Sequence, residues 1–287
     1  MRKLLFIMMM LIVLPAMAQK ELTVTVSEKH SSKGKVPGFE VEIPQTTTKD
    51  ATNLLEKTLV NSKVVISFKK KPKLVKEKDE WVMRGVIVDR ITTDSLNVFA
   101  QVASFADRSL VTLFFETPKG FIGGKEDEAK IIDATKDYVR DYAVIVYRDA
   151  VEKELKNEEN KLKSFQNDLS RAEKQESSIN KQISDLKSNI ASAKGLIKEN
   201  ETLIEQNKSA IKLDESATAK KELEAKISAQ KKEITKQNKQ ASQYEKKISQ
   251  LEKKIIGGQS EQKTIKTHIE RQEATVTDVR TKLSGIR

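Results

Sequence analysis

Residues 179–213 read INKQISDLKSNIASAKGLIKENETLIEQNKSAIKL, and an isoleucine recurs every seven residues from Ile183 to Ile211. A second apolar series lies three residues after the heptad positions of the first; its members are Ile179, Leu186 and Ala193. Apolar residues at the first and fourth positions of a repeated heptad form the seam of a coiled coil. This stretch therefore predicts a helix that packs along its length against another helix.

The heptad pattern continues in both directions. Upstream it reaches Val151, with Glu176 as the polar residue in its one gap, and a second run extends from Leu223 to Ile286. The further seam residues are Leu155, Leu162, Phe165, Leu169 and Ala172 in the first run, and Ile227, Ile234, Ala241, Tyr244, Ile248, Leu251, Ile255, Ile265, Ile269, Val276, Val279 and Leu283 in the second. Both runs far exceed the three or four heptads that indicate a coiled coil.

The two runs do not continue each other on one straight helix. Ile211 and Ile227 are sixteen residues apart, two more than a whole number of heptads. On a continuous helix this offset would turn the apolar stripe by roughly 200°. We therefore predict a chain reversal near residues 214–219, where Asp214, Ser216 and Thr218 each suit a helix N-cap. Residues 148–287 would then form an antiparallel hairpin.

Folding at the reversal also predicts a register. A turn centred near Ala217 places Ile183 beside Leu251 and Leu186 beside Ile248, and Val151 beside Leu283. It also brings the weak seam positions Glu176 and Gly258 into one layer. A register displaced by one heptad is an alternative, although it spreads the polar layers more widely. Each arm would be on the order of 100 Å long.

Residues 1–18 have the features of an export signal. Arg2 and Lys3 form its charged start, residues 4–14 are apolar but too short to span a bilayer, and residues 16–18 read Ala-Met-Ala. We expect a mature protein that begins at Gln19 and is exported and soluble, most simply in a Gram-negative periplasm. The chain has no cysteine, which excludes a lipid-modified cysteine, disulfides and thiol chemistry. Export argues against nucleic acid as the target of the net charge of +11.

Residues 19–147 predict an α+β domain. Strands are expected at 22–26, 39–43, 63–69, 81–91, 96–105 and 110–116, with a helix from Thr48 or Asp50 to about Val60. Short connections favour antiparallel pairing. The expected contributors to the sheet's core are Ile87, Val98, Val102, Leu113 and Phe115. A helix from near Glu126 should cover the sheet through Ile131, Ile132, Tyr138, Val139, Tyr142, Ile145 and Val146, and then run on into the coiled coil as a stiff stalk.

Val36-Pro-Gly-Phe-Glu-Val-Glu-Ile-Pro44 is followed by the first expected helix. The order strand, helix, four strands, helix over residues 36–147 resembles the TATA-binding-protein-like fold, as in a small domain of unknown function in exported Gram-negative proteins. The resemblance implies an α+β fold and supplies no catalytic residues. A fold of this kind does not by itself imply DNA binding.

Chemistry-bearing motifs are sparse. His30 and His268 show no metal-ligand spacing, and the usual nucleophile, zinc and phosphate-binding motifs do not occur. Gly120, Gly123 and Gly124 precede a helix, where an ordinary turn is the simpler interpretation than an anion site. We therefore expect a protein that is not an enzyme, with no cofactor and no metal.

One basic cluster stands out around Pro72. Its members are Lys69, Lys70, Lys71, Lys73, Lys76 and Lys78. They could contact anionic head groups or an acidic partner of the envelope. They could equally form a solvated loop whose lysines discourage edge-to-edge strand pairing, and we favour this interpretation.

Three functions fit these features. The first is a structural or scaffolding protein that binds protein partners through the stalk, with a second copy of itself among them. Leu196, Leu203 and Ile256 lie on the flanks of the seam and would remain exposed in a two-helix hairpin. The alternatives are a holdase-type chaperone, which an apolar cleft between the arms would favour, and a regulator of a cell-wall enzyme. The polar seam residues Asn200, Asn207, Gln230, Gln237 and Gln272 would lower stability while specifying register.

Overall fold

The computed structural model describes residues 22–61, 73–124 and 129–287. The predicted export signal, the predicted strand at 63–69 and the predicted helix start near Glu126 lie outside these residues. The chain forms two compact units. Unit 1 comprises the chain up to Glu158 together with Thr275–Arg287, and unit 2 is Glu159–Ala274.

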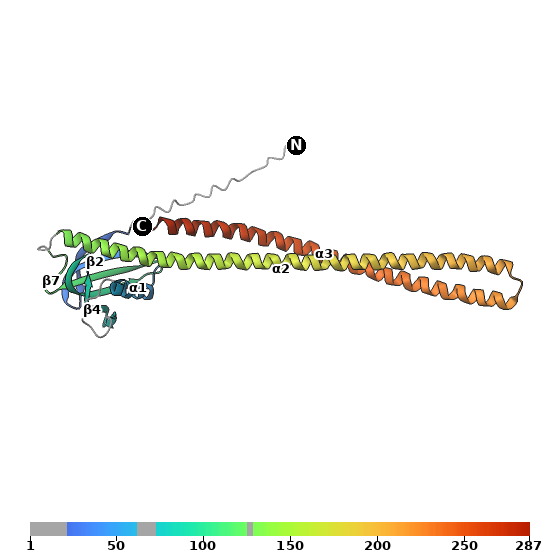
Figure 1. Cartoon of the computed structure of the whole chain (residues 1–287), viewed down its shortest axis with the longest axis horizontal. Coiled ribbons are helices and arrows are strands. Elements are labelled where there is room, and N and C mark those ends of the chain that lie inside the picture. Colours follow the sequence, from blue (N-terminus) through green and yellow to red (C-terminus); the bar gives the residue numbers. More distant parts are fainter. Residues whose placement is uncertain (1–21, 62–72, 125–128) are drawn as a thin grey trace, which may run out of the picture. The chain divides into compact units, whose positions relative to one another are not determined.

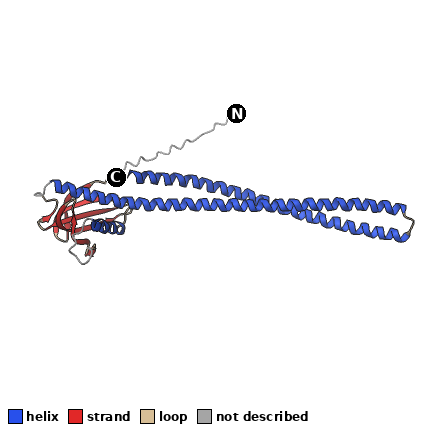
Figure 2. Ribbon diagram, in the orientation of Figure 1, coloured by secondary structure: helices blue, strands red, loops and turns tan. Residues whose placement is uncertain are grey.

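Unit 1 contains one antiparallel sheet, whose described strands run in the order β1-β2-β6-β5-β4-β3, with β7 paired to β6 (Figure 2). The predicted antiparallel hairpins are thereby confirmed. The strands are β1 (Val24–Ser31), β2 (Gly34–Pro44), β3 (Val75–Glu77), β4 (Glu80–Val88), β5 (Thr92–Ser104), β6 (Arg108–Thr117) and β7 (Gly120–Phe121), and the helix α1 (Thr48–Asn61) follows β2.

The main core lies on one face of the sheet, between the strands, α1 and the first turns of α2 (Ala129–Leu213). The side chains of β2 alternate between the two faces of the sheet, as in any strand: Phe39, Val41 and Ile43 are buried in the core, and the residues between them face the other side. The predicted core residues Val98, Leu113 and Phe115 are fully buried, and Val102 packs at the core's edge. The Tyr142 hydroxyl donates a hydrogen bond of 2.9 Å to the Ala51 carbonyl and so joins α2 to α1.

One predicted core residue of the sheet, Ile87, and one predicted residue of the covering helix stripe, Ile145, are wrong. Ile87 is half buried and outside the core, whereas Val86 and Val88 are buried in it. The register of β4 against β5 is irregular on both sides of Val86, and such an irregularity changes which side chains face the core. Ile145 is 45% exposed, because the stripe of α2 that meets the sheet is narrower than the apolar pattern implies.

A second, smaller cluster lies on the opposite face of the sheet, where Val82, Phe99 and Phe114 are buried. Strand β2 passes close to this cluster at Gly38, where a Cβ atom would lie 2.8 Å from Thr112 Cγ2 and 2.9 Å from Phe114 Cε1. The sequence patterns did not predict this close passage.

The tip of the β1–β2 hairpin is bound to the far strands of the sheet. The Ser32 amide donates to Glu80 Oε1 at 3.0 Å, and Gln101 Nε2 donates to the same oxygen at 2.8 Å. Gln101 Nε2 also donates to the His30 carbonyl at 2.8 Å. The hairpin tip therefore lies near β4 and β5, although β2 pairs with β6.

Helices α2 and α3 (Ala217–Gly285) are joined by three residues and pack against each other as a hairpin, as predicted (Figure 1). Asp214 Oδ1 accepts a hydrogen bond of 2.8 Å from the Ser216 amide, which tightens the turn. Ser216 Oγ accepts from the Ala219 amide at 3.4 Å, so Ser216 serves as the N-cap of α3.

The seam of unit 2 contains the residues that the predicted register brings together. Ile179, Ile183, Leu186 and Ile190 from α2 form one buried cluster with Ile248 and Leu251 from α3. Glu176, which the predicted register places in one layer with Gly258, is hydrogen-bonded by two glutamines of α3. Its two carboxylate oxygens accept hydrogen bonds from Gln259 Nε2 at 2.8 Å and Gln262 Nε2 at 2.7 Å.

The C-terminal turns of α3 belong to unit 1. Val279 and Ile286 are buried with Val151, and Tyr147, Leu155 and Leu283 pack against them. Lys282 Nζ donates to Glu154 Oε2 at 2.9 Å and to Gln45 Oε1 at 2.6 Å. The end of the chain is therefore part of the packing that completes the sheet domain.

Candidate interaction surfaces

The predicted basic cluster is only partly described, because Lys69, Lys70 and Lys71 lie outside the described residues. Lys73, Lys76 and Lys78 are exposed around β3, the last described strand along the sheet. Lys76 Nζ lies 5.9 Å from the centroid of the Trp81 ring. Lysines beside an edge strand discourage pairing with another chain. This position favours the structural interpretation of the three described lysines.

The one acidic residue of β3, Glu77, is bound to an arginine rather than to these lysines. Arg84 donates two parallel hydrogen bonds to its carboxylate, one of them from Nη2 to Oε2 at 2.8 Å. The guanidinium holds the pKa of Glu77 below its usual range. The three lysines therefore keep their positive charge unpaired by Glu77.

In the distal part of unit 2 the seam is polar and large apolar side chains lie exposed beside it. Asn207 Nδ2 donates to Gln230 Oε1 across the hairpin at 3.1 Å, and Asn200 Nδ2 donates back to the Leu196 carbonyl at 2.9 Å. Leu196 is 45% exposed and Leu203 is 39% exposed, one heptad apart on α2. The prediction that Leu196, Leu203 and Ile256 remain exposed is confirmed.

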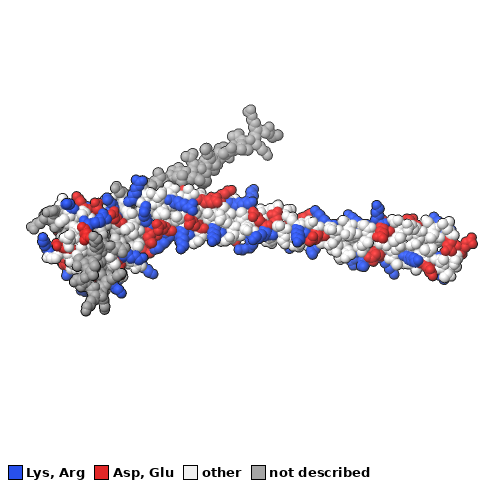
Figure 3. Space-filling model, viewed as in Figure 1, with Lys and Arg blue, Asp and Glu red and all other residues white. Residues whose placement is uncertain are grey.

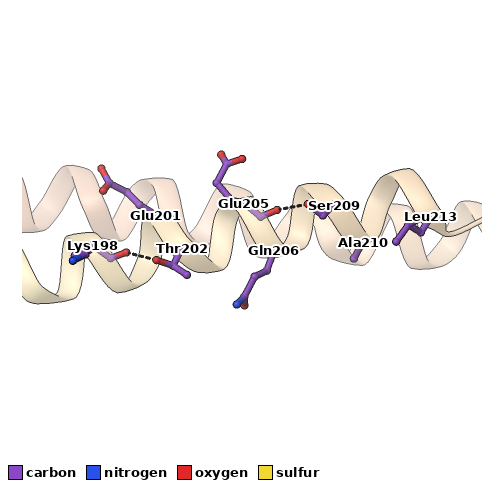
Figure 4. A pocket seen from close by; sticks show the side chains of 8 residues that line it. All are labelled: Lys198, Glu201, Thr202, Glu205, Gln206, Ser209, Ala210 and Leu213. Carbon is purple, nitrogen blue, oxygen red and sulfur yellow. Dashed lines mark hydrogen bonds between the residues drawn. The ribbon is translucent and has the colours of Figure 1, made fainter.

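A shallow depression lies on α2 close to the turn (Figure 4). Six of its lining side chains are polar, and Ala210 and Leu213 are the apolar ones. The Thr202 and Ser209 hydroxyls both donate to carbonyls of their own helix, at 3.0 Å. Most of the surface that lines the depression is nevertheless apolar, because the methyl and methylene groups of these side chains form it.

A second depression lies on unit 1, beside β1, β2 and β6, and its charged groups pair with one another. Glu40 Oε2 accepts from Lys29 Nζ at 2.8 Å. Arg108 Nη1 donates to Asp107 at 3.1 Å, and the guanidinium lies 5.1 Å from the Phe105 ring centroid. These contacts stabilise the surface and leave no convergent set of catalytic groups.

Within the described residues, neither histidine belongs to a group of side chains that could hold a metal ion. His30 is exposed, and the centroid of the His268 ring lies 5.5 Å from that of the Phe165 ring, on the other helix of the hairpin. Across residues 22–61, 73–124 and 129–287, no three His, Asp or Glu side chains are grouped so that they could hold a metal ion. In the same residues, none of the helices combines the length and apolarity needed to cross a bilayer.

Neither a family model nor a curated protein matches the chain. Function is therefore inferred from the surfaces of the chain itself. Over the visible face of the long helices, positive and negative side chains are interspersed (Figure 3). The large apolar side chains exposed on the last turns of α2 are Leu196, Leu203 and Leu213.

Proposed function

We propose that this chain is an exported, non-catalytic scaffolding protein whose helical hairpin binds other proteins through the flank of α2 around Leu196 and Leu203. One observation carries the proposal: these two leucines are about half exposed, one heptad apart, beside seam layers occupied by Asn200 and Asn207. Apolar side chains at heptad spacing are the pattern by which one helix recognises another.

The polar seam explains why this flank is available. Two-helix packing buries Ile204 beside it, which is only 6% exposed, but Asn207 and Gln230 use their layer for a hydrogen bond. Asn200 and Asn207 thus place amides at seam positions, and Leu196 and Leu203, three or four residues from them, leave their apolar area on the exposed flank. A third helix lying against Leu196 and Leu203 would cover this area and gain the free energy of its burial.

A holdase would need a broad apolar surface for unfolded chains. The depression near the turn is confined to one helix, α2, and Leu213 is its one large apolar side chain, so it is not a broad apolar surface between the two arms. The paired leucines form a narrow stripe suited to one helix, which is the geometry of a specific contact.

The experiment is sedimentation equilibrium of the mature chain, residues 19–287, because a second copy is the partner that can be tested first. We expect reversible self-association with a dissociation constant on the order of tens of micromolar. Leu196→Lys combined with Leu203→Lys should raise this dissociation constant about tenfold or more. Both positions are exposed, so the far-ultraviolet circular dichroism should not change.

Ile256→Lys is the matched control, since Ile256 is 68% exposed on α3 and also lies in unit 2. It should leave association unchanged. A chain that stays strictly monomeric contradicts self-association through this flank. If Ile256→Lys weakens self-association as much as the double variant does, the contact is not specific to the flank around Leu196 and Leu203.

A further inference from the structure

Four lysines recur every seven residues on α3: Lys232, Lys239, Lys246 and Lys253. All four are exposed, and they occupy the heptad position farthest from the seam residues Ile234, Ala241 and Ile248. At 1.5 Å of rise per residue they are spaced by about 10.5 Å and extend over about 32 Å. We call these four residues the lysine ridge.

The lysine ridge lacks the acidic neighbours that usually balance lysine on a helix. Side chains three and four residues apart are neighbours on a helix surface. The residues at these spacings from the ridge lysines are Ser228, Ala229, Thr235, Lys236, Ser242, Gln243, Ser249, Gln250, Ile256 and Gly257. Elsewhere in unit 2, Lys208 pairs with Glu205 at 2.7 Å and Lys236 with Glu233 at 3.5 Å. The structure gives none of the four ridge lysines an ion pair within the described residues.

The two arms of the hairpin also differ in net charge. Residues 228–254 of α3 contain eight lysines and three glutamates, a net charge of +5. Residues 180–206 of α2, which lie opposite them in the hairpin register, contain four lysines and four acidic residues, a net charge of zero. The positive charge is thus concentrated on one side of the hairpin.

The shape and chemistry of this face indicate the kind of partner. The face is the convex outside of a single helix, and a plane that touches it meets the ridge lysines together with Ser242, Ser249 and Gln250. These side chains are small or polar and can donate hydrogen bonds. A protein partner would require large apolar or aromatic side chains at the centre of the contact. Between residues 228 and 253 the one apolar neighbour of the ridge lysines is the small Ala229, and the exposed Ile256 lies beyond the last of them. A compact anion would require a concave site.

We propose that the lysine ridge is an interaction surface for an anionic phospholipid bilayer, with α3 lying on the phosphate head groups and inserting no side chain into the acyl region. The proposal is independent of the α2 flank. It also differs from the lysines around β3, which belong to the other unit. Several lysines that reach one plane together add their attractions to it, which a scattered set cannot do.

The test is co-sedimentation of residues 19–287 with vesicles of phosphatidylglycerol and phosphatidylcholine, and with vesicles of phosphatidylcholine alone. Residues 1–18 are omitted, because their apolar segment would itself enter the vesicles. We expect binding only to the anionic vesicles, and we expect salt to weaken it. Each lysine at an anionic surface contributes about fivefold in partition, so Lys232→Gln, Lys239→Gln, Lys246→Gln and Lys253→Gln together should lower it about a hundredfold or more.

A matched variant removes the same charge elsewhere in unit 2. Lys161, Lys198, Lys208 and Lys266 are exposed, and each has an acidic residue three or four positions away. Changing all four to Gln should lower the partition far less. Replacing the four ridge lysines by arginine should preserve binding, and circular dichroism checks that each variant keeps its helices.

Three results would overturn the proposal. The first is equal loss of binding in the ridge variant and the matched variant, which would make net charge alone responsible. The second is no binding to anionic vesicles by the unmodified chain. The third is ridge-dependent binding of soluble polyphosphate without vesicle binding, which would assign the ridge to a linear polyanion.

Discussion

At the scale of single residues, Gly38 is a position where a side chain does not fit. A Cβ atom there would lie 2.8 Å and 2.9 Å from side-chain carbons of Thr112 and Phe114, both in a well-packed part of the sheet. We expect Gly38→Ala to destabilise unit 1 by about 1–3 kcal/mol through overpacking. Trp81, the only tryptophan, lies in unit 1, so its fluorescence during urea denaturation measures this effect.

Gly195→Ala is the control for that substitution. Gly195 is exposed in the interior of α2, and a Cβ atom there would meet nothing within 4 Å. Alanine should stabilise the helix by about 0.5–1 kcal/mol, because glycine loses more backbone entropy on folding. If both substitutions shift stability in the same direction, steric exclusion at Gly38 is not the cause.

Asp50 makes the free energy of unfolding of unit 1 depend on pH. Its carboxylate accepts hydrogen bonds from Lys153 Nζ and Thr47 Oγ1, both at 2.6 Å, and these lower its pKa. A lowered folded-state pKa stabilises the fold above the unfolded pKa of about 4, and this contribution is lost as pH falls through the folded pKa. Asp50→Asn should therefore cost about 1 kcal/mol or less at neutral pH, and its difference from the native chain should shrink as the pH falls through the lowered folded-state pKa. Urea denaturation at a series of pH values measures this difference, and a difference that stays constant across the acidic range would contradict the role of the Asp50 carboxylate.

At the scale of elements, the hairpin depends on a narrow seam. Ile248 is 9% exposed and packs with Leu186 and its neighbours, whereas Ile256, eight residues later on the same helix, is 68% exposed. Ile248→Ala should cost about 2–4 kcal/mol through lost burial and a cavity, and Ile256→Ala less than about 0.5 kcal/mol. Far-ultraviolet circular dichroism follows the helices during denaturation. Equal costs for the two substitutions would contradict the assigned seam.

At the scale of the whole molecule, the first and the last described segments both belong to unit 1. A chain that stops at Ala274 lacks Val279, Lys282 and Ile286, and so uncovers Val151 and leaves Glu154 without its lysine. We expect this truncation to lower the midpoint of the Trp81 fluorescence transition and to increase binding of an apolar dye, because buried apolar surface becomes exposed. An unchanged midpoint would show that the sheet domain is complete without the end of α3.

The heptad spacing of the two runs and the offset between Ile211 and Ile227 were enough to predict both helices, the reversal near residue 214 and a register, because a seam is a local periodicity in consecutive residues. The heptad spacing of the first run also predicted that Leu196 and Leu203 lie exposed. The ridge lysines of α3 recur at the same seven-residue interval, but their lack of ion pairs within the described residues is visible only in the structure.

Tertiary structure decided what depends on contacts between segments far apart in the chain. No periodicity in the sequence predicts the close contact of β2 at Gly38, the register irregularity of β4 that turns Ile87 away from the core, or the burial of Ile286 in unit 1. In each case the free energy comes from steric fit and burial between distant segments, and the order of residues along one segment does not encode that fit.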